Sequence, residues 1–184
     1  FSKTHLSIAN VVLQAINDGK NPIDPEHVQA GLHTGYLYNM ESFDEVKSAF
    51  YRQLEYFMNW HQTFNNVLEF YGNPLVPVPM ASATMDGCME KGKDVSSGGA
   101  MYNFGPGVVW SGLATYADAM AAIRKLVFDD RKYTLKQLNE ALKADFEGYD
   151  QIRTDCLNAP KYGNDDDYAD LIAADIIAFT EDEH

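Results

Sequence analysis

The most informative stretch of the sequence runs Gly98-Gly99-Ala100-Met101-Tyr102-Asn103-Phe104-Gly105-Pro106-Gly107. Glycine lacks a Cβ atom, so it tolerates a positive φ and lets a second backbone approach closely. We therefore predict a short strand over residues 99–104 that packs tightly against its neighbours. The pattern is neither GxGxxG nor the Walker form with its Lys-Ser/Thr, so it does not indicate a nucleotide site.

Outside this stretch the apolar residues mostly recur at helical spacing. A helix is expected almost from the start of the chain, and a long one follows the S-x-x-E capping box of Ser42 and Glu45. The long helix should stop at Gly72-Asn73-Pro74, and further helices are expected over residues 117–128, after Thr134 and over 165–179. The long helix is rich in aromatic residues, which predicts that its apolar positions are buried. These positions are Val46, Phe50, Leu54, Phe57, Phe64, Val67 and Leu68.

Charge and composition narrow the class of protein. The chain holds 27 acidic and 14 basic residues, a formal charge of -13, which repels phosphate backbones and anionic lipid surfaces. Neither an apolar run of about 18 residues nor a signal-peptide pattern is present in the sequence. We expect a cytoplasmic protein with no nucleic-acid partner and no membrane partner. The two cysteines, Cys88 and Cys156, are too few for a disulfide framework and lie outside metal-ligand spacing.

The titratable residues offer few candidate sites. The acidic run at residues 164–170 could pass for a calcium loop, but it lacks the D-x-D-x-D-G spacing, and acids at a helix N-terminus also answer the helix dipole. The five histidines are scattered, so no metal site is expected. Cys88 lies between Asp86 and Glu90, which argues against a thiolate nucleophile. A stand-alone acidic helical binding module stays open as a second class of protein, and a metal-dependent gain of helix would favour it.

Four blocks of sequence, in order, resemble those of the glycyl radical enzymes, the pyruvate formate-lyase-like superfamily. The first runs Asp86-Gly87-Cys88-Met89-Glu90-Lys91-Gly92-Lys93-Asp94-Val95 and continues with Gly98 to Asn103. The others lie within residues 121–130, 138–149 and 158–165, the last reading Asn158-Ala159-Pro160-Lys161-Tyr162-Gly163-Asn164-Asp165. Residues 1–75 fit the same family more loosely.

This resemblance implies an α/β fold, a ten-stranded α/β barrel of which residues 1–184 form a single, mostly helical internal segment. It also implies a glycyl radical in the full-length enzyme, installed by an S-adenosylmethionine/iron-sulfur activating enzyme. The implied partners are the remainder of the enzyme, that activating enzyme and a small iron-sulfur subunit, and the full-length protein is expected to be a homo-oligomer. The radical glycine lies in a motif like Arg-Val-Ala-Gly-Tyr, which this sequence does not contain. No bound cofactor is expected in this segment.

The family's thiyl cysteine usually lies in Gly-Cys-x-Glu, which Gly87-Cys88-Met89-Glu90 matches literally. In the family, however, the thiyl loop precedes a helical stretch like residues 6–18, whereas a second, non-catalytic cysteine precedes the Gly-Gly-Ala-x-Tyr-Asn block. Cys88 fits the second place. The resemblance thus implies no catalytic residue within this chain, with Cys88 kept as the thiyl alternative.

Residues 103–116 and 144–150 resemble the 4-hydroxyphenylacetate-type arylacetate decarboxylases. The resemblance implies a lyase that releases carbon dioxide by radical chemistry, and it places Asp86 near a substrate-side Glu that could accept a phenol proton. Asp86 is one methylene shorter than that Glu, and it could equally be a helix-cap or surface acid. A glycyl radical lyase or dehydratase that acts on a polyol, choline or a sulfonate would share every block and stays open as the alternative.

Overall fold

The computed structural model describes residues 3–22, 26, 28–103 and 107–182. The chain divides into two compact units, which are described separately: unit 1 holds Phe1–Leu6 and Phe57–Trp110, and unit 2 holds Ser7–Tyr56 and Ser111–His184. The elements in chain order are β1 (Lys3–Ser7), α1 (Ile8–Ile16), the 3-10 turn η1 (Leu37–Asn39), α2 (Phe43–Leu75), α3 (Pro79–Thr84), α4 (Cys88–Lys91), the 3-10 turn η2 (Val95–Ser97), β2 (Gly107–Ser111), α5 (Leu113–Ile123), the π-helical turn η3 (Arg124–Asp129), α6 (Leu135–Lys143), α7 (Asp150–Asn158) and α8 (Asp167–Asp182).

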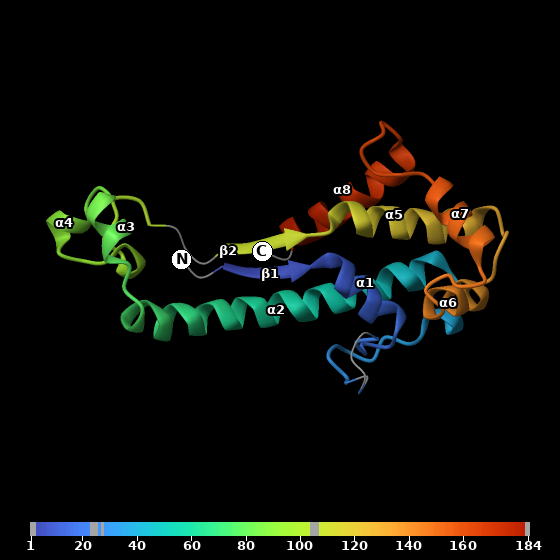
Figure 1. Ribbon diagram of the computed structural model, residues 1–184, viewed down its shortest axis with the longest axis horizontal. Helices are drawn as coiled ribbons and strands as arrows, with labels where there is room; N and C mark the ends of the chain where they lie inside the picture. The colour runs from blue at the N-terminus through green and yellow to red at the C-terminus, as the bar shows by residue number, and fades with distance from the viewer. Residues whose placement is uncertain (1–2, 23–25, 27, 104–106, 183–184) are drawn as a thin grey trace. The chain divides into compact units, whose positions relative to one another are not determined.

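Unit 2 is a helical body with a conventional apolar core. Helix α5 packs against α1 and α8 (Figure 1), and α6 packs against η1 and α7. The N-terminal half of α2 contributes Phe50, whose ring stacks on the fully buried Tyr116 of α5 with 4.3 Å between centroids. Gly112 lets α5 begin close to α1, because a Cβ at this position would lie 3.3 Å from the backbone nitrogen of Ala9.

Unit 1 contains the C-terminal half of α2, the short helices α3 and α4, and most of a two-stranded sheet. Strands β1 and β2 are hydrogen-bonded neighbours and run in the same direction (Figure 1). A parallel pair needs a long crossover connection, which here is the whole chain between Ser7 and Gly107. Among the described residues, only three of the buried apolar side chains belong to unit 1, and they are Leu6, Cys88 and Ala100.

Two helix starts follow the sequence signals. The Thr134 hydroxyl accepts the backbone N–H of Gln137 at 3.2 Å, and the Gln137 amide oxygen accepts the backbone N–H of Thr134 at 2.9 Å, so α6 has the full predicted capping box. At α2 the Ser42 hydroxyl accepts the Glu45 N–H at 3.2 Å. The Glu45 carboxylate, however, accepts the backbone N–H of Glu41 at 2.9 Å, one residue beyond the expected partner.

Three predictions about secondary structure are wrong. Residues 98–103 form turns and bends, while the strand lies at Gly107–Ser111; residues 104–106 lie outside the described residues. Gly98, directly before the predicted strand, has a φ of 85° that belongs to a turn, whereas Val109-Trp110 is the β-branched and aromatic sequence that strands prefer. Residues 3–7 form β1 rather than a helix, and α1 begins at Ile8. Helix α2 also passes Gly72 and ends at Leu75, one residue after Pro74, whose backbone nitrogen carries no hydrogen and cannot donate to the helix.

The predicted burial of the long helix is correct for one half only. In unit 2, Val46, Phe50 and Leu54 of α2 are at most 1% exposed. In unit 1, Phe64 and Val67 of the same helix are 53% and 47% exposed, so the predicted burial is wrong there. Within the described part of the chain, no helix combines the length and apolar character that a membrane span requires.

Candidate functional site

The site that the sequence singles out lies in unit 1, where a tight turn at residues 86–88 meets the glycine-rich loop. Gly87 has a φ of 93° and precedes the short helix α4, whose first residue is Cys88. The Cys88 side chain is 2% exposed and forms no disulfide. The Asp86 side chain is exposed on the turn, and the Asp86 carbonyl accepts the backbone N–H of Met101 at 2.7 Å. The structural role of Cys88 and the substrate contact of Asp86 both stay predictions.

Two glycines make the contact between the turn and the loop possible. A Cβ at Gly87 would lie 3.0 Å from the Gly99 carbonyl oxygen, and a Cβ at Gly99 would lie 2.1 Å from the carbonyl oxygen of Lys93. Real Cβ atoms essentially never come as close as 2.1 Å to another heavy atom, so Gly99 requires glycine. Gly87 favours glycine because its φ of 93° lies in the left-handed region that other residues rarely adopt. The Lys91 ammonium donates to the Ala100 carbonyl at 2.8 Å and ties α4 to the same loop. The predicted close backbone approach at the glycine-rich stretch is confirmed at Gly99.

A carboxylate that the sequence analysis did not single out holds the loop in place. One oxygen of Asp94 accepts the Val78 N–H at 2.8 Å and lies 2.7 Å from the Ser82 hydroxyl of α3. The other accepts the N–H and the hydroxyl of Ser96 at 2.9 and 2.6 Å. The Ser96 hydroxyl and then the Ser82 hydroxyl hold the pKa of Asp94 well below its usual range.

The local part of this network has a sequence signal. An Asp two residues before a Ser commonly caps a turn through its own side chain, as Asp94 does at η2. The bonds to Val78 and Ser82, which are 16 and 12 residues away in the chain, have no local signal. The Asp94 network therefore joins the start of α3 to η2, and it lies directly before Gly98 and Gly99.

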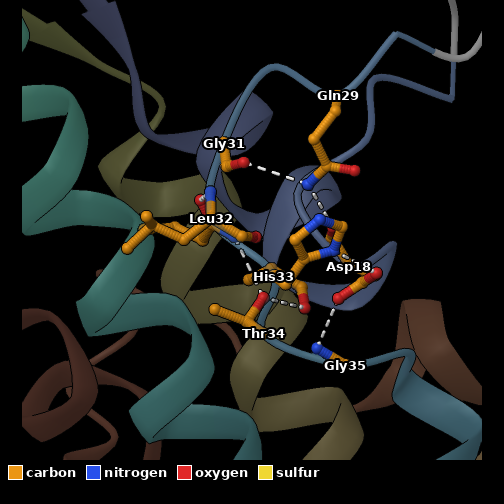
Figure 2. Close-up of polar contacts among 9 residues, drawn as sticks. Asp18, Gln29, Gly31, Leu32, His33, Thr34 and Gly35 are labelled. Atoms are coloured by element: carbon orange, nitrogen blue, oxygen red, sulfur yellow. Dashed lines mark hydrogen bonds and ion pairs between the residues drawn. The ribbon is translucent and has the colours of Figure 1, made fainter.

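A second polar cluster lies in unit 2, in the loop between α1 and η1 (Figure 2). Asp18 has a φ of 57° and accepts the Gly35 N–H at 2.8 Å, and its second oxygen lies 2.9 Å from Nδ1 of the exposed His33. These contacts, led by that of His33, lower the pKa of Asp18. Gln29 donates to the Asp18 carbonyl at 2.7 Å and to the Gly31 carbonyl at 3.0 Å. The cluster joins the two ends of the loop.

The same loop is held to α2 by a buried amide. Gln53 is 0% exposed; its oxygen accepts the Leu32 N–H at 3.0 Å and its nitrogen donates to the Leu32 carbonyl at 2.6 Å. Its nitrogen also donates to the Thr34 hydroxyl at 3.0 Å. A Cβ at Gly31 would lie 2.2 Å from the Gln53 amide oxygen, so a larger residue there would have to displace the Gln53 side chain. The hydrogen bonds of Asp18, Gln29 and Gln53 join parts of the chain to one another, which fits a structural role for the loop.

The acidic run before α8 caps that helix, as the sequence analysis favoured. The Asp166 side chain accepts the Tyr168 N–H at 3.0 Å, and the Asp170 side chain accepts the Gly163 N–H at 2.8 Å. Asp167 and Asp170 lie in the first turn, next to the positive end of the helix dipole. Among the described residues, no group of three or more His, Cys, Asp or Glu side chains is arranged to hold a metal ion.

Comparison with known proteins identifies the family to which this chain belongs. The profile of the family described as "Pyruvate formate lyase-like" matches residues 1–184. The chain belongs to the pyruvate formate lyase-like family. The resemblance seen in the four sequence blocks is thereby confirmed, and so is the α/β barrel class of fold, which the glycyl radical enzymes of this family share.

Several members of the pyruvate formate lyase-like family are similar along most of this chain. The trans-4-hydroxy-L-proline dehydratase of Clostridioides difficile is 39% identical over 94% of this chain and 22% of its own length. A crystal structure of hydroxyproline dehydratase from that organism matches with a TM-score of 0.83 and 37% identity, covering 97% of this chain and 22% of its own.

Two further relatives have other substrates. The (2S)-3-sulfopropanediol dehydratase of Klebsiella oxytoca is 36% identical over 90% of this chain and 20% of its own length. The indoleacetate decarboxylase of Tractidigestivibacter scatoligenes is 29% identical over 86% of this chain and 20% of its own length. The chain thus spans about one fifth of the length of each of these relatives.

Proposed function

We propose that this chain is an internal segment of a glycyl radical lyase. The observation that carries the proposal is the family match over residues 1–184, combined with a length that is about one fifth of the relatives'. The sequence contains no stretch like Arg-Val-Ala-Gly-Tyr, so the radical glycine belongs to another segment of the full-length enzyme. An activating enzyme, a small iron-sulfur subunit, homo-oligomerisation and a cytoplasmic location belong to the same proposal.

The residues of this segment would serve as wall and support for the radical site. A thiyl radical is destroyed by oxygen and by stray hydrogen donors, so the protein around it has to exclude both and hold one substrate atom in place. The contacts at Gly87 and Gly99 bring three stretches of backbone together without intervening side chains. Such close packing fits a wall that excludes oxygen and stray hydrogen donors. Asp86 stays the candidate substrate contact from this segment.

The relatives favour a dehydratase over a decarboxylase as the reaction of the full-length enzyme. Along this segment the two dehydratases are 39% and 36% identical, whereas the indoleacetate decarboxylase is 29% identical. We therefore place a dehydratase that acts on a small hydroxylated substrate first. The arylacetate decarboxylase is the second candidate, supported by the resemblance at residues 103–116.

The test requires the coding sequence on both sides of this segment. An upstream Gly-Cys-x-Glu and a downstream glycyl motif are expected, and their absence would overturn the proposal. The full-length enzyme, treated anaerobically with its activating enzyme, should show the doublet of a glycyl radical in its EPR spectrum, whereas the 184-residue chain should show none. Turnover of trans-4-hydroxy-L-proline or of a diol, but not of 4-hydroxyphenylacetate, would support the dehydratase; the reverse would support the decarboxylase.

A substitution at Cys88 separates its two roles. If Cys88 is a packing residue, Cys88→Ser in the full-length enzyme should lower the melting temperature modestly, because it places a hydroxyl in a site that is 2% exposed, and should leave measurable turnover. Complete loss of turnover, with an unchanged fold and an intact glycyl radical signal, would identify Cys88 as the thiyl residue instead.

A further inference from the structure

The C-terminal half of α2 exposes a continuous apolar stripe. Phe64, Val67, Tyr71 and Leu75 follow one another at intervals of three, four and four residues, which places them on one face of the helix. Their exposed fractions are 53%, 47%, 61% and 78%. We call these four residues the α2 stripe. It covers three turns of helix, or roughly 16 Å at 1.5 Å per residue.

The surroundings of the α2 stripe have the composition of an interface. Residues 56–85 contain one formally charged side chain, Glu69, although 22% of the whole chain is charged. Unit 1 carries three basic and four acidic residues, a formal charge of -1, and unit 2 carries eleven basic and 23 acidic residues, a charge of -12. Depletion of charge together with exposed aromatic residues is typical of the buried centre of protein interfaces. Solvent-facing helices ordinarily have the opposite composition.

Another face of the same half-helix is already covered. Asn65 is 3% exposed, and burial lowers the pKa of the neighbouring His61. The α2 stripe lies on a different face from Asn65, while Asn66 faces nearly opposite to the stripe and is exposed. The half-helix therefore has a covered polar edge, an exposed polar face and an exposed apolar stripe.

We propose that the α2 stripe is the seat of a helix supplied by the same polypeptide from outside residues 1–184. Intervals of three and four residues are those at which one helix packs its side chains between those of another. The relatives are more than four times as long as this chain, so most of such a polypeptide lies outside it. This inference rests on the proposed function only in requiring a longer polypeptide, and not on any radical chemistry.

A second copy of the chain fits the surface less well. Exposed apolar side chains also occur elsewhere in unit 1, on the α2–α3 connection, α3, α4 and the glycine-rich loop, and they include Val76, Met80, Met89, Met101 and Tyr102. A twofold contact between two α2 stripes would bury one helix face and leave these residues in water. Several segments of a longer chain can cover them all, as in the core of a larger domain.

The test compares cysteine reactivity on two faces of α2. Val67→Cys places a thiol on the α2 stripe, and Asn66→Cys places one on the opposite, polar face. In the 184-residue chain both should react with a maleimide at similar rates, located by peptide mass spectrometry to exclude Cys88 and Cys156. In the full-length protein, without radical activation, Val67→Cys should react at least tenfold more slowly, while Asn66→Cys keeps its rate.

Two outcomes would overturn the proposal. Equal rates for Val67→Cys in the two proteins would show that nothing covers the stripe. Protection of Val67→Cys that disappears when the full-length protein is diluted to its monomer would make a second copy the occupant. Because no substrate or radical is involved, an inactive full-length protein with a protected Val67→Cys would contradict the proposed function and leave this inference standing.

A charge on the stripe provides an independent measurement. Phe64→Glu should lower the melting temperature of the full-length protein, because it places a carboxylate where the incoming helix packs. In the 184-residue chain the same change should leave the melting temperature unchanged and reduce self-association. A similar fall in melting temperature in both proteins would mean that Phe64 is needed within unit 1 itself, which would also overturn the proposal.

Discussion

The two halves of helix α2 have similar apolar patterns, but they differ in how far their apolar side chains are buried. In the N-terminal half, Val46, Phe50 and Leu54 are at most 1% exposed and form part of the core of unit 2. In the C-terminal half, Phe64 and Tyr71 are 53% and 61% exposed. Both halves contain apolar residues at intervals of three and four. The halves differ in what packs against them: the ring of Tyr116 from α5 stacks on Phe50, whereas the described residues of unit 1 leave the α2 stripe exposed.

An apolar stripe in the sequence therefore indicates that a helix face needs a packing partner, but it does not indicate that the partner is present. Unit 2 satisfies that need within residues 7–56 and 111–184, since nearly all the buried apolar side chains among the described residues belong to it. Unit 1 holds only Leu6, Cys88 and Ala100 of that set. Because burial of apolar surface is the main favourable term in folding, unit 1 should be the less stable unit of the isolated chain.

The largest effect is expected from alanine in the two halves of α2. Phe50→Ala removes a ring that is 1% exposed and stacked on Tyr116, and it should lower the free energy of unfolding by about 3–5 kcal/mol. Phe64→Ala in the 184-residue chain should change it by less than about 0.5 kcal/mol. Urea unfolding followed by far-UV circular dichroism measures both. Equal losses would mean that the two halves do not differ.

A smaller effect is expected at the glycine-rich loop. Gly99→Ala should lower the stability of unit 1 by about 1–3 kcal/mol, because the added methyl would meet the Lys93 carbonyl at 2.1 Å. Gly107→Ala is the matched control, since open space surrounds that position. Both tryptophans, Trp60 and Trp110, belong to unit 1, so tryptophan fluorescence reports its unfolding. Coinciding midpoints for the two variants would remove the requirement for glycine at Gly99.

The Asp94 network should make unit 1 sensitive to acid. Hydrogen bonds in the folded state lower the pKa of Asp94, so its contribution is complete above the unfolded pKa of about 3.9 and is lost as the pH falls toward the lower folded value. Asp94→Asn should therefore lower the fluorescence-detected urea midpoint at neutral pH, and the gap to wild type should narrow in acid. Asp86→Asn, at an exposed position of the same unit, should keep the wild-type midpoint at neutral pH. A gap for Asp94→Asn that does not depend on pH would exclude the carboxylate as its cause.

The smallest effect is expected at the edge of the N-terminal half of α2. Lys47 lies 2.5 Å from Asp175 of α8, with exposed side-chain fractions of 34% and 52%. Such pairs contribute about 0–1 kcal/mol, so Lys47→Ala should cost at most that and less in high salt. Pairing with Asp175 raises the pKa of Lys47, so this contribution is present at neutral pH and is lost as the pH rises beyond about 10.4. A loss comparable to that of Phe50→Ala would show that the pair is part of the core.

Features that depend on neighbours in the sequence were predictable. The Thr134 capping box, the Ser42 cap and the acids before α8 all act within a few residues, and the structure confirms each. The predicted close backbone approach is also present at Gly99. The predicted strand at residues 99–104 is wrong. Glycine permits several backbone conformations, and its presence in the sequence does not indicate which of them the chain adopts. The hydrogen bonds of Gln53 to Leu32 and of Asp94 to Val78 and Ser82 join residues 12 to 21 positions apart, and no local pattern predicts them.

The sequence by itself determined the family, the capped starts of α2, α6 and α8, and the acidic balance, because ordered blocks and local caps depend on residues that are neighbours in the sequence. Only the tertiary structure decided which half of α2 is buried, why Gly99 has to be glycine and where the acidic charge lies. Burial depends on what a side chain faces across space, and a glycine is required by atoms that come from elsewhere in the chain. Those contacts join residues that are far apart in the sequence. A sequence pattern can therefore indicate that a side chain needs a partner, but only the fold determines which residue that partner is.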